Sequence, residues 1–174
     1  MERTLWVVGL LALFLACLWL MYRSWRARER RQADRVGELP TVPAELGVEQ
    51  LPSTTGVYLG STFAPSWQDR IVVGDLGFRA TTTLTGYAEG ILLDRAGATP
   101  LWIPRSSVTV IRTERGHAGK VMTAGGVLVV RWTLPNGTEV DTGFRGDDKT
   151  VYSAWVTDSD GSKDASEQTG DDEG

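Results

Sequence analysis

The sequence holds one cysteine and one histidine in 174 residues, and this scarcity excludes several kinds of site. With Cys17 alone no internal disulfide can form, and Cys17 and His117 together give too few ligands for a usual zinc cluster. A Ser-His-Asp or Cys-His arrangement would have to use His117, which lies in the glycine-flanked stretch RGHAGK with no nucleophile motif nearby. We therefore expect His117 to be a solvated loop residue, and we expect no catalytic residue, no metal site and no cofactor.

Neither the glycine spacing nor the charge balance indicates binding of phosphate groups. Two residues instead of four separate Gly116 from Gly119, and Val121 instead of Ser or Thr follows Lys120. Residues 53–157 hold ten Lys/Arg and nine Asp/Glu, which leaves no basic face for a nucleic acid. We therefore expect no nucleic-acid partner.

One long hydrophobic run lies near the start of the sequence. Residues 5–22 contain no charge and no proline. At about 1.5 Å per residue a helix of this length measures about 27 Å, close to the hydrocarbon thickness of a bilayer. Aromatic residues lie toward both ends, as in the belts of membrane helices: Trp6, Trp19, Tyr22 and Trp25. We predict a transmembrane helix over residues 5–22, preceded by a short flank at 1–4.

Two other roles of this run fit the residues less well. A cleaved signal peptide has a shorter apolar region and a small-residue cleavage site, whereas here Met21 and Tyr22 lead into Arg23. The triplet Leu15-Ala16-Cys17 has the form of a lipoprotein site, but five apolar or aromatic residues follow the cysteine. We interpret Cys17 as a small apolar residue inside the membrane helix.

Six arginines follow the hydrophobic run and predict its orientation: Arg23, Arg26, Arg28, Arg30, Arg31 and Arg35. Positive residues beside a membrane helix stay in the cytoplasm, and the N-terminal flank offers only Arg3 and the α-amino group, offset by Glu2. We predict that the N-terminus is outside and that the rest of the chain is cytoplasmic. The segment 23–35 has two open roles: its arginines only set this topology, or they also contact anionic headgroups of the inner leaflet.

Prolines and then strand patterns come after the arginines. Residues 36–52 carry three prolines and no apolar periodicity, which predicts a semi-extended linker that holds a domain clear of the membrane. Residues 53–157 show short alternating segments rich in β-branched and aromatic residues, which predict a small antiparallel barrel or sandwich of about seven strands. The segments are 55–63, 70–86, 89–104, 106–114 and 126–144.

The last of these segments has the strongest hairpin signal. Asn136-Gly137 favours a two-residue type I′ turn, in which both central residues have positive φ. On the first arm, alternate residues share a face. One face carries Leu128, Val130, Trp132 and Leu134, and the other carries Val127, Val129, Arg131 and Thr133.

Helical spacing appears once after the membrane run. Val151 and Trp155 stand at i and i+4, and Asp147 or Asp148 is available to cap the first turn. We predict a helix near 147–156 that closes one mouth of the barrel, with Val151, Tyr152 and Trp155 as its plug. Residues 158–174 hold seven acids and one lysine, and we expect this tail to be disordered.

The loop APSWQDRI is the most unusual connection between strands, and it has two interpretations. In the first, Trp67 caps the barrel while Asp69 and Arg70 pair to fix the loop. In the second, Trp67, Asp69 and Arg70 form a binding surface for a partner or ligand, because Trp and Arg are enriched in binding hot spots.

Several of these segments together resemble a known family. The segments are SWQDRI, GILLDRAG, PLWIPRSSV, AGKVMTAGGVLVVRW and DTGFRGDD, placed after one N-terminal apolar helix. Over residues 1–157 the chain is similar to actinobacterial single-pass membrane proteins with a pleckstrin homology-like (PH-like) domain. The resemblance implies two nearly orthogonal antiparallel sheets closed by a C-terminal helix, and it implies no catalytic motif. The phosphoinositide site of eukaryotic PH domains does not carry over, because Arg70 is the only cation in the loop between the first two expected strands.

These features favour a membrane-tethered, non-enzymatic interaction module. The expected partners are the lipid bilayer, through residues 5–22, and a protein or a second copy of the chain. The alternative is a domain that binds a lipid or small ligand at a barrel mouth near Trp67 and Arg70.

Overall fold

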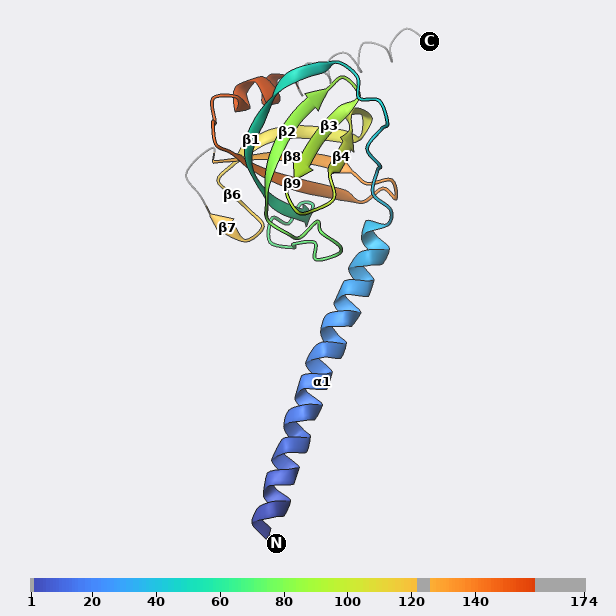
Figure 1. The fold of residues 1–174 in the computed structure, drawn as a ribbon, viewed down its shortest axis with the longest axis vertical. Coiled ribbons are helices and arrows are strands. Elements are labelled where there is room, and N and C mark those ends of the chain that lie inside the picture. The colour runs from blue at the N-terminus through green and yellow to red at the C-terminus, as the bar shows by residue number, and fades with distance from the viewer. Residues whose placement is uncertain (1, 122–125, 159–174) are drawn as a thin grey trace.

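The computed structural model describes residues 2–121 and 126–158, which form one long helix and a β domain that a short helix closes (Figure 1). The expected disorder of the acidic tail concerns residues outside this description, apart from Asp158. The elements are α1 (Glu2–Val36), β1 (Glu49–Phe63), β2 (Ala80–Tyr87), β3 (Gly90–Arg95), β4 (Leu101–Pro104), a 3₁₀ turn (Arg105–Ser107), β5 (Val108–Glu114), β6 (Gly116–His117), β7 (Lys120–Val121), β8 (Val127–Thr133) and β9 (Glu139–Gly146). The short helix covers residues 152–158.

Seven antiparallel strands form one sheet in the order β4-β3-β2-β1-β9-β8-β5, and β6 and β7 form a separate small hairpin. The sheet folds over on itself, so that β2 to β4 cross in front of β8 and β9 in Figure 1. The prediction of about seven antiparallel strands followed by a C-terminal helix is therefore confirmed.

The long strand β1 joins the two halves of the sheet. Its first part pairs with β2, its last part pairs with β9, and the register with β9 shifts between Tyr58 and Gly60. Gly60 has a φ of +112°, which side chains with a Cβ rarely adopt. A bulge with glycine at this position lets the strand bend from one half into the other.

Two boundaries differ from the expectation. Strand β1 begins at Glu49, inside the expected linker. The strand tolerates Pro52 because this residue lies where the pairing with β2 shifts register, so its missing N–H does no harm. Residues 71–79, which we expected to extend a strand, form a loop with a turn at 74–77 instead. Glycines at 74 and 77 interrupt the apolar alternation there.

The β8–β9 hairpin forms as predicted, but its turn is of another type. Leu134 C=O accepts a hydrogen bond from Gly137 N–H at 2.8 Å, and Gly137, but not Asn136, has a positive φ. The type I′ prediction was therefore wrong. Pro135 fixes a negative φ at the first central position, which favours a type I turn followed by a left-handed glycine.

The core fills the space between the two halves of the sheet. It includes one of the two expected faces of β8 (Leu128, Val130, Trp132 and then Leu134), while Val127 and Val129 form a smaller cluster with Leu59 on the other face. The alternation of the two faces is confirmed. The helix over 152–158 begins a few residues later than expected and closes this core.

Helix α1 runs without a break from Glu2 to Val36, so the arginine-rich segment is helical. Gly37 follows in a left-handed conformation, with φ +63°, and its N–H bonds Ala33 C=O at 2.9 Å, as in a glycine C-cap. Within the described part of the chain, no helix combines the length and apolar character needed to cross a membrane.

Candidate functional site

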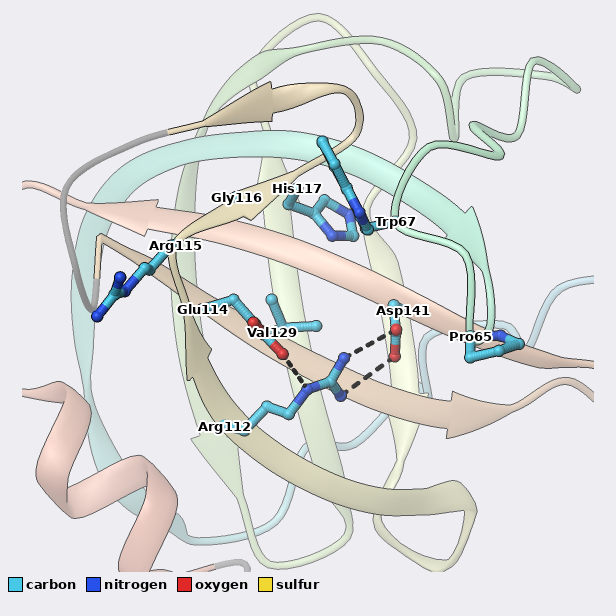
Figure 2. Close-up of a pocket in the computed structure, with 9 residues that line it drawn as sticks. All are labelled: Pro65, Trp67, Arg112, Glu114, Arg115, Gly116, His117, Val129 and Asp141. Atoms are coloured by element: carbon cyan, nitrogen blue, oxygen red, sulfur yellow. Dashed lines mark hydrogen bonds and ion pairs between the residues drawn. The ribbon is translucent and has the colours of Figure 1, made fainter.

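A cavity of about 280 Å³ lies on the outer face of the sheet, over strands β5, β8 and β9. We call it the Trp67 pocket. Trp67 and His117 bound it on one side, and the ion pair of Arg112 and Asp141 lies opposite (Figure 2). Its lining residues are Pro65, Trp67, Arg112, Glu114, Arg115, Gly116, His117, Val129 and Asp141.

Strand alternation explains why charged residues line this face. Ile111, Val130 and Val140 point into the core. Their neighbours Arg112, Val129 and Asp141 therefore point outward from β5, β8 and β9. Arg112 pairs with Val129, and Asp141 pairs with Arg131, two residues further along β8. The pocket is thus built by non-local strand pairing, and its walls come from the β6–β7 hairpin and the β1–β2 connection.

Asp141 is the centre of the charged cluster. Both of its carboxylate oxygens accept hydrogen bonds from Arg131, at 2.9 and 2.8 Å, and from Arg112, at 3.3 and 2.9 Å. Arg112 also donates through Nε to Glu114, at 2.8 Å. Burial by itself would raise the pKa of Asp141, but the hydrogen bonds from the two arginines outweigh it and lower that pKa. Asp141 is therefore a fixed carboxylate and not a proton donor near neutral pH.

His117 is buried, with 2 % of its surface exposed, so the expectation of a solvated loop residue was wrong. Its Nε2 lies 3.0 Å from Gly60 O, and since a carbonyl only accepts, Nε2 carries the proton. Burial lowers the pKa of His117, so the ring is neutral at physiological pH. The ring packs against Gly143 and fastens the β6–β7 hairpin to the sheet.

The structure separates the three residues of the loop candidate. Trp67 lines the pocket and is partly exposed. Asp69 Oδ2 lies 4.0 Å from Nη1 of Arg35 on α1. Arg70 donates through Nη2 to the carbonyls of Leu59, at 3.0 Å, and Gly77. Its guanidinium holds the loop together, and Arg70 does not line the Trp67 pocket.

The end of α1 packs against the domain at the same loop. Val36 is 2 % exposed and belongs to the core. Gln32 donates to Arg70 O at 3.3 Å and accepts from Val72 N–H at 2.9 Å. Arg35 lies 3.9 Å from the ring centre of Phe63, and its carbonyl accepts from Asn136 Nδ2 at 2.8 Å. The linker therefore does not separate helix from domain, because the chain makes its first core contact at the helix end.

The arginines of α1 fall into different settings. Arg23 and Arg26 lie over the rings of Trp19 and Tyr22, at 5.7 and 5.4 Å, and Arg30 is exposed. Arg35 contacts the domain. The side chains of Arg28 and Arg31 lie outside the described residues.

The three residues expected to plug the barrel lie together on the core. Trp155 is 1 % exposed, Tyr152 is buried, and Val151 packs against the same cluster. The Tyr152 hydroxyl accepts a hydrogen bond from Gly146 N–H at 2.8 Å. The helix is thereby tied to the end of β9.

The chemistry of the Trp67 pocket suits binding rather than proton transfer. Its two carboxylates are paired with arginines, and its histidine is neutral and already bonded. Among the described residues, no group of three or more His, Cys, Asp or Glu side chains comes together as in a metal site. Sequence reasoning missed Arg112 and Asp141 because they are distant in sequence, and it set His117 aside as a solvated loop residue.

The fold and this site can now be compared with known proteins. A family-level comparison matches residues 36–160 to the family described as bacterial PH domain-like. The chain belongs to this family. The match supports the PH-like part of the resemblance, and its start at residue 36 coincides with the first core residue, Val36. PH-like domains are generally non-catalytic interaction modules. A search of the curated proteins found no match.

Proposed function

We propose that the chain is a membrane-tethered, non-enzymatic interaction module. In this proposal residues 5–22 cross the bilayer, the PH-like domain lies on the cytoplasmic side, and a protein partner binds at the Trp67 pocket. The main support for this proposal is that α1 joins the domain directly. One unbroken helix leads from the apolar run to Val36, which is part of the core of the domain.

The sequence and the exposure of α1 support the anchor. The run 5–22 includes Leu5 and Val8, whose side chains lie outside the described residues. The large apolar side chains described between Trp6 and Tyr22 are exposed on every face of the helix. A helix that is apolar all round needs an apolar surrounding, and a bilayer supplies one. The arginines that follow favour a cytoplasmic domain.

The Trp67 pocket supports binding of a protein segment. Trp67 offers a large, partly exposed aromatic surface, and aromatic anchors beside arginines are typical of binding hot spots. Arg112 and Arg115 line the pocket together with the carboxylates of Glu114 and Asp141, and Arg112 is paired with both carboxylates. The exposed side chain of Arg115 favours a segment that presents a carboxylate next to an apolar side chain.

Photo-crosslinking in native membranes tests this proposal. A photoreactive phenylalanine derivative replaces Trp67 or Arg115 at the pocket, and Ala154, exposed on the helix 152–158, in a control. We expect one protein to be captured from both pocket positions and not from position 154. Capture of lipid alone from the pocket positions would favour the alternative of a lipid-binding domain. Equal capture from all three positions would contradict a site at the pocket.

A further inference from the structure

One side chain bonds the β6–β7 hairpin, residues 116–121, to the sheet. Each strand of the hairpin has two residues, and its turn holds Ala118 and Gly119 at positive φ, +50° and +79°. A two-stranded hairpin is marginally stable at best in water when it stands alone. Within the described part of the chain, the one hydrogen bond from this hairpin to the sheet runs from His117 Nε2 to Gly60 O, at 3.0 Å.

The His117 ring is also part of the Trp67 pocket. It lies against Gly143 of β9, and Gly143 pairs with Val129 of β8. The ring is 2 % exposed and Val129 is 1 % exposed, although both line the cavity. His117 and Trp67 border the cavity on the same side (Figure 2). Departure of the hairpin from the sheet would therefore remove this wall of the pocket.

Charged groups from several elements face the His117 ring. They are Asp141 of β9, Arg112 and Glu114 of β5, Arg115 beside β6, Arg70 of the β1–β2 connection and, bonded to Asp141, Arg131 of β8. The side chain of Lys120, on the hairpin itself, lies outside the described residues. The ring thus lies among more cations than anions.

The surroundings of His117 suit a neutral ring. A proton on Nδ1 would add a donor, and among the described residues Nδ1 has no hydrogen-bond partner. Asp141 attracts a cation, but both of its oxygens already accept hydrogen bonds from arginines, and Arg112 and Arg70 repel a cation. Burial, the largest cause, lowers the pKa of His117 together with these two arginines and outweighs Gly60 O and Asp141.

We propose that protonation of His117 releases the β6–β7 hairpin from the sheet and removes the wall of the Trp67 pocket, so that binding at this pocket weakens on acidification. As a regulation of binding, this inference rests on the proposed function, whereas release of the hairpin does not.

The size of the effect follows from proton linkage. A ring released into water has the ordinary pKa of 6.5 and the attached ring has a lower pKa, so a proton favours the released form. The attached form is therefore fully favoured above pH 6.5 and loses stability below it. Each pH unit below 6.5 raises the ratio of released to attached form by at most about tenfold, which gives a limit of about 30-fold near pH 5.

Hydrogen exchange of the full chain in detergent micelles tests the release. Mass spectrometry measures exchange in peptides that cover residues 116–121 at about pH 7.5 and about pH 5, and each rate is divided by the intrinsic rate at that pH. Peptides from β9 and from the helix 152–158 report on the rest of the domain. His117→Gln is the matched control, because an amide can donate to Gly60 O but does not titrate. NMR of the single histidine gives the protonation of its ring on the same samples.

The expected result is a rise of about 10- to 30-fold in residues 116–121 of the parent, in step with protonation of the ring. Exchange in β9 and in the helix stays unchanged, and His117→Gln shows no rise. Absence of a rise in the parent would overturn the inference. So would an equal rise in β9 and the helix, a rise that persists in His117→Gln, or a rise that precedes protonation of the ring.

These outcomes need no partner, so they leave the crosslinking test of the proposed function unaffected. Repeating that crosslinking at both pH values tests the regulation itself. We expect lower capture from position 115 near pH 5 than near pH 7.5. Equal capture at both pH values would overturn the regulation while the proposed function stands.

Discussion

The imidazole of His117 fills the space that a side chain at Gly143 would need. A Cβ atom at position 143 would stand 2.3 Å from His117 Cδ2 and 2.7 Å from Cγ, both closer than real atoms approach. Gly143 lies on β9 and His117 on β6, so this contact joins the small hairpin to the outer face of the sheet. The wall of the Trp67 pocket depends on it.

Gly143→Ala is therefore expected to displace the hairpin and lower the free energy of unfolding by about 1–3 kcal/mol. The measurement is chemical denaturation of the full chain in detergent micelles. His117→Ala provides the matched background, because without the ring an added methyl group has room. In that background the same substitution should cost much less, and equal costs in both backgrounds would show that the two residues are not in contact.

Stability should fall as the pH drops below the ordinary histidine pKa of 6.5. Burial lowers the pKa of His117 in the folded state, so the imidazole takes up a proton more readily in the unfolded chain. Acidification therefore stabilises the unfolded state relative to the folded state. The contribution of neutral His117 to the free energy of unfolding is complete above pH 6.5 and declines below it. Asp75 and Asp141, whose pKa values are lowered from 3.8, act in a more acidic window.

Denaturation midpoints between pH 7 and pH 5 check this prediction. His117→Gln should flatten the slope in that interval, because His117 is the single histidine of the chain. An unchanged slope in the variant would mean that another group controls the acid sensitivity.

Trp155→Ala is expected to cost about 3–5 kcal/mol of unfolding free energy, since it removes a large buried ring and leaves a cavity. The ring lies against β2, where a Cβ atom at Gly86 would stand 3.1 Å from Trp155 Cη2. Ser153→Ala, at an exposed position of the same helix, should stay within about 0.5 kcal/mol of the parent. A loss below about 1 kcal/mol for Trp155→Ala would argue for an outward-facing binding role instead.

A fragment of residues 30–158 should be more stable than one of residues 53–157. The shorter fragment lacks Val36, whose burial contributes about 1.5–3 kcal/mol, and also the pairing of Glu49 and Leu51 with β2. Thermal unfolding of both fragments by circular dichroism gives the comparison. Equal midpoints would indicate that the junction with α1 adds nothing to the fold.

The sequence contained enough local information for the strands of the domain. Val127 to Thr133 alternate so regularly that the two faces of β8 could be separated, and i, i+4 spacing located the terminal helix. The turn after β8 was assigned from Asn136-Gly137 alone, whereas the preceding Pro135 determined its type. A local pattern predicted the structure correctly where no neighbouring residue imposed a different conformation.

Long-range contacts could not be predicted in the same way. Gln32 and Val36 end a segment dominated by arginine, and nothing in their surroundings reveals that they meet Val72 and the core. His117 and Gly143 are far apart in sequence, and only the register of β9 with β1 brings Gly60, which bonds the imidazole, beside them. The candidate site therefore came from the structure, although Trp67 was singled out from the sequence.

Topology reporters test the central proposal, a membrane-anchored module with a cytoplasmic domain, most directly. Alkaline phosphatase, active only outside the cytoplasm, and a fluorescent protein that matures only inside are fused separately after Gly174, and alkaline extraction measures membrane integration. We predict an integrated protein with a bright fluorescent fusion and an inactive phosphatase fusion. Active phosphatase with a dark fluorescent fusion, or release of the chain by alkali, would contradict the account.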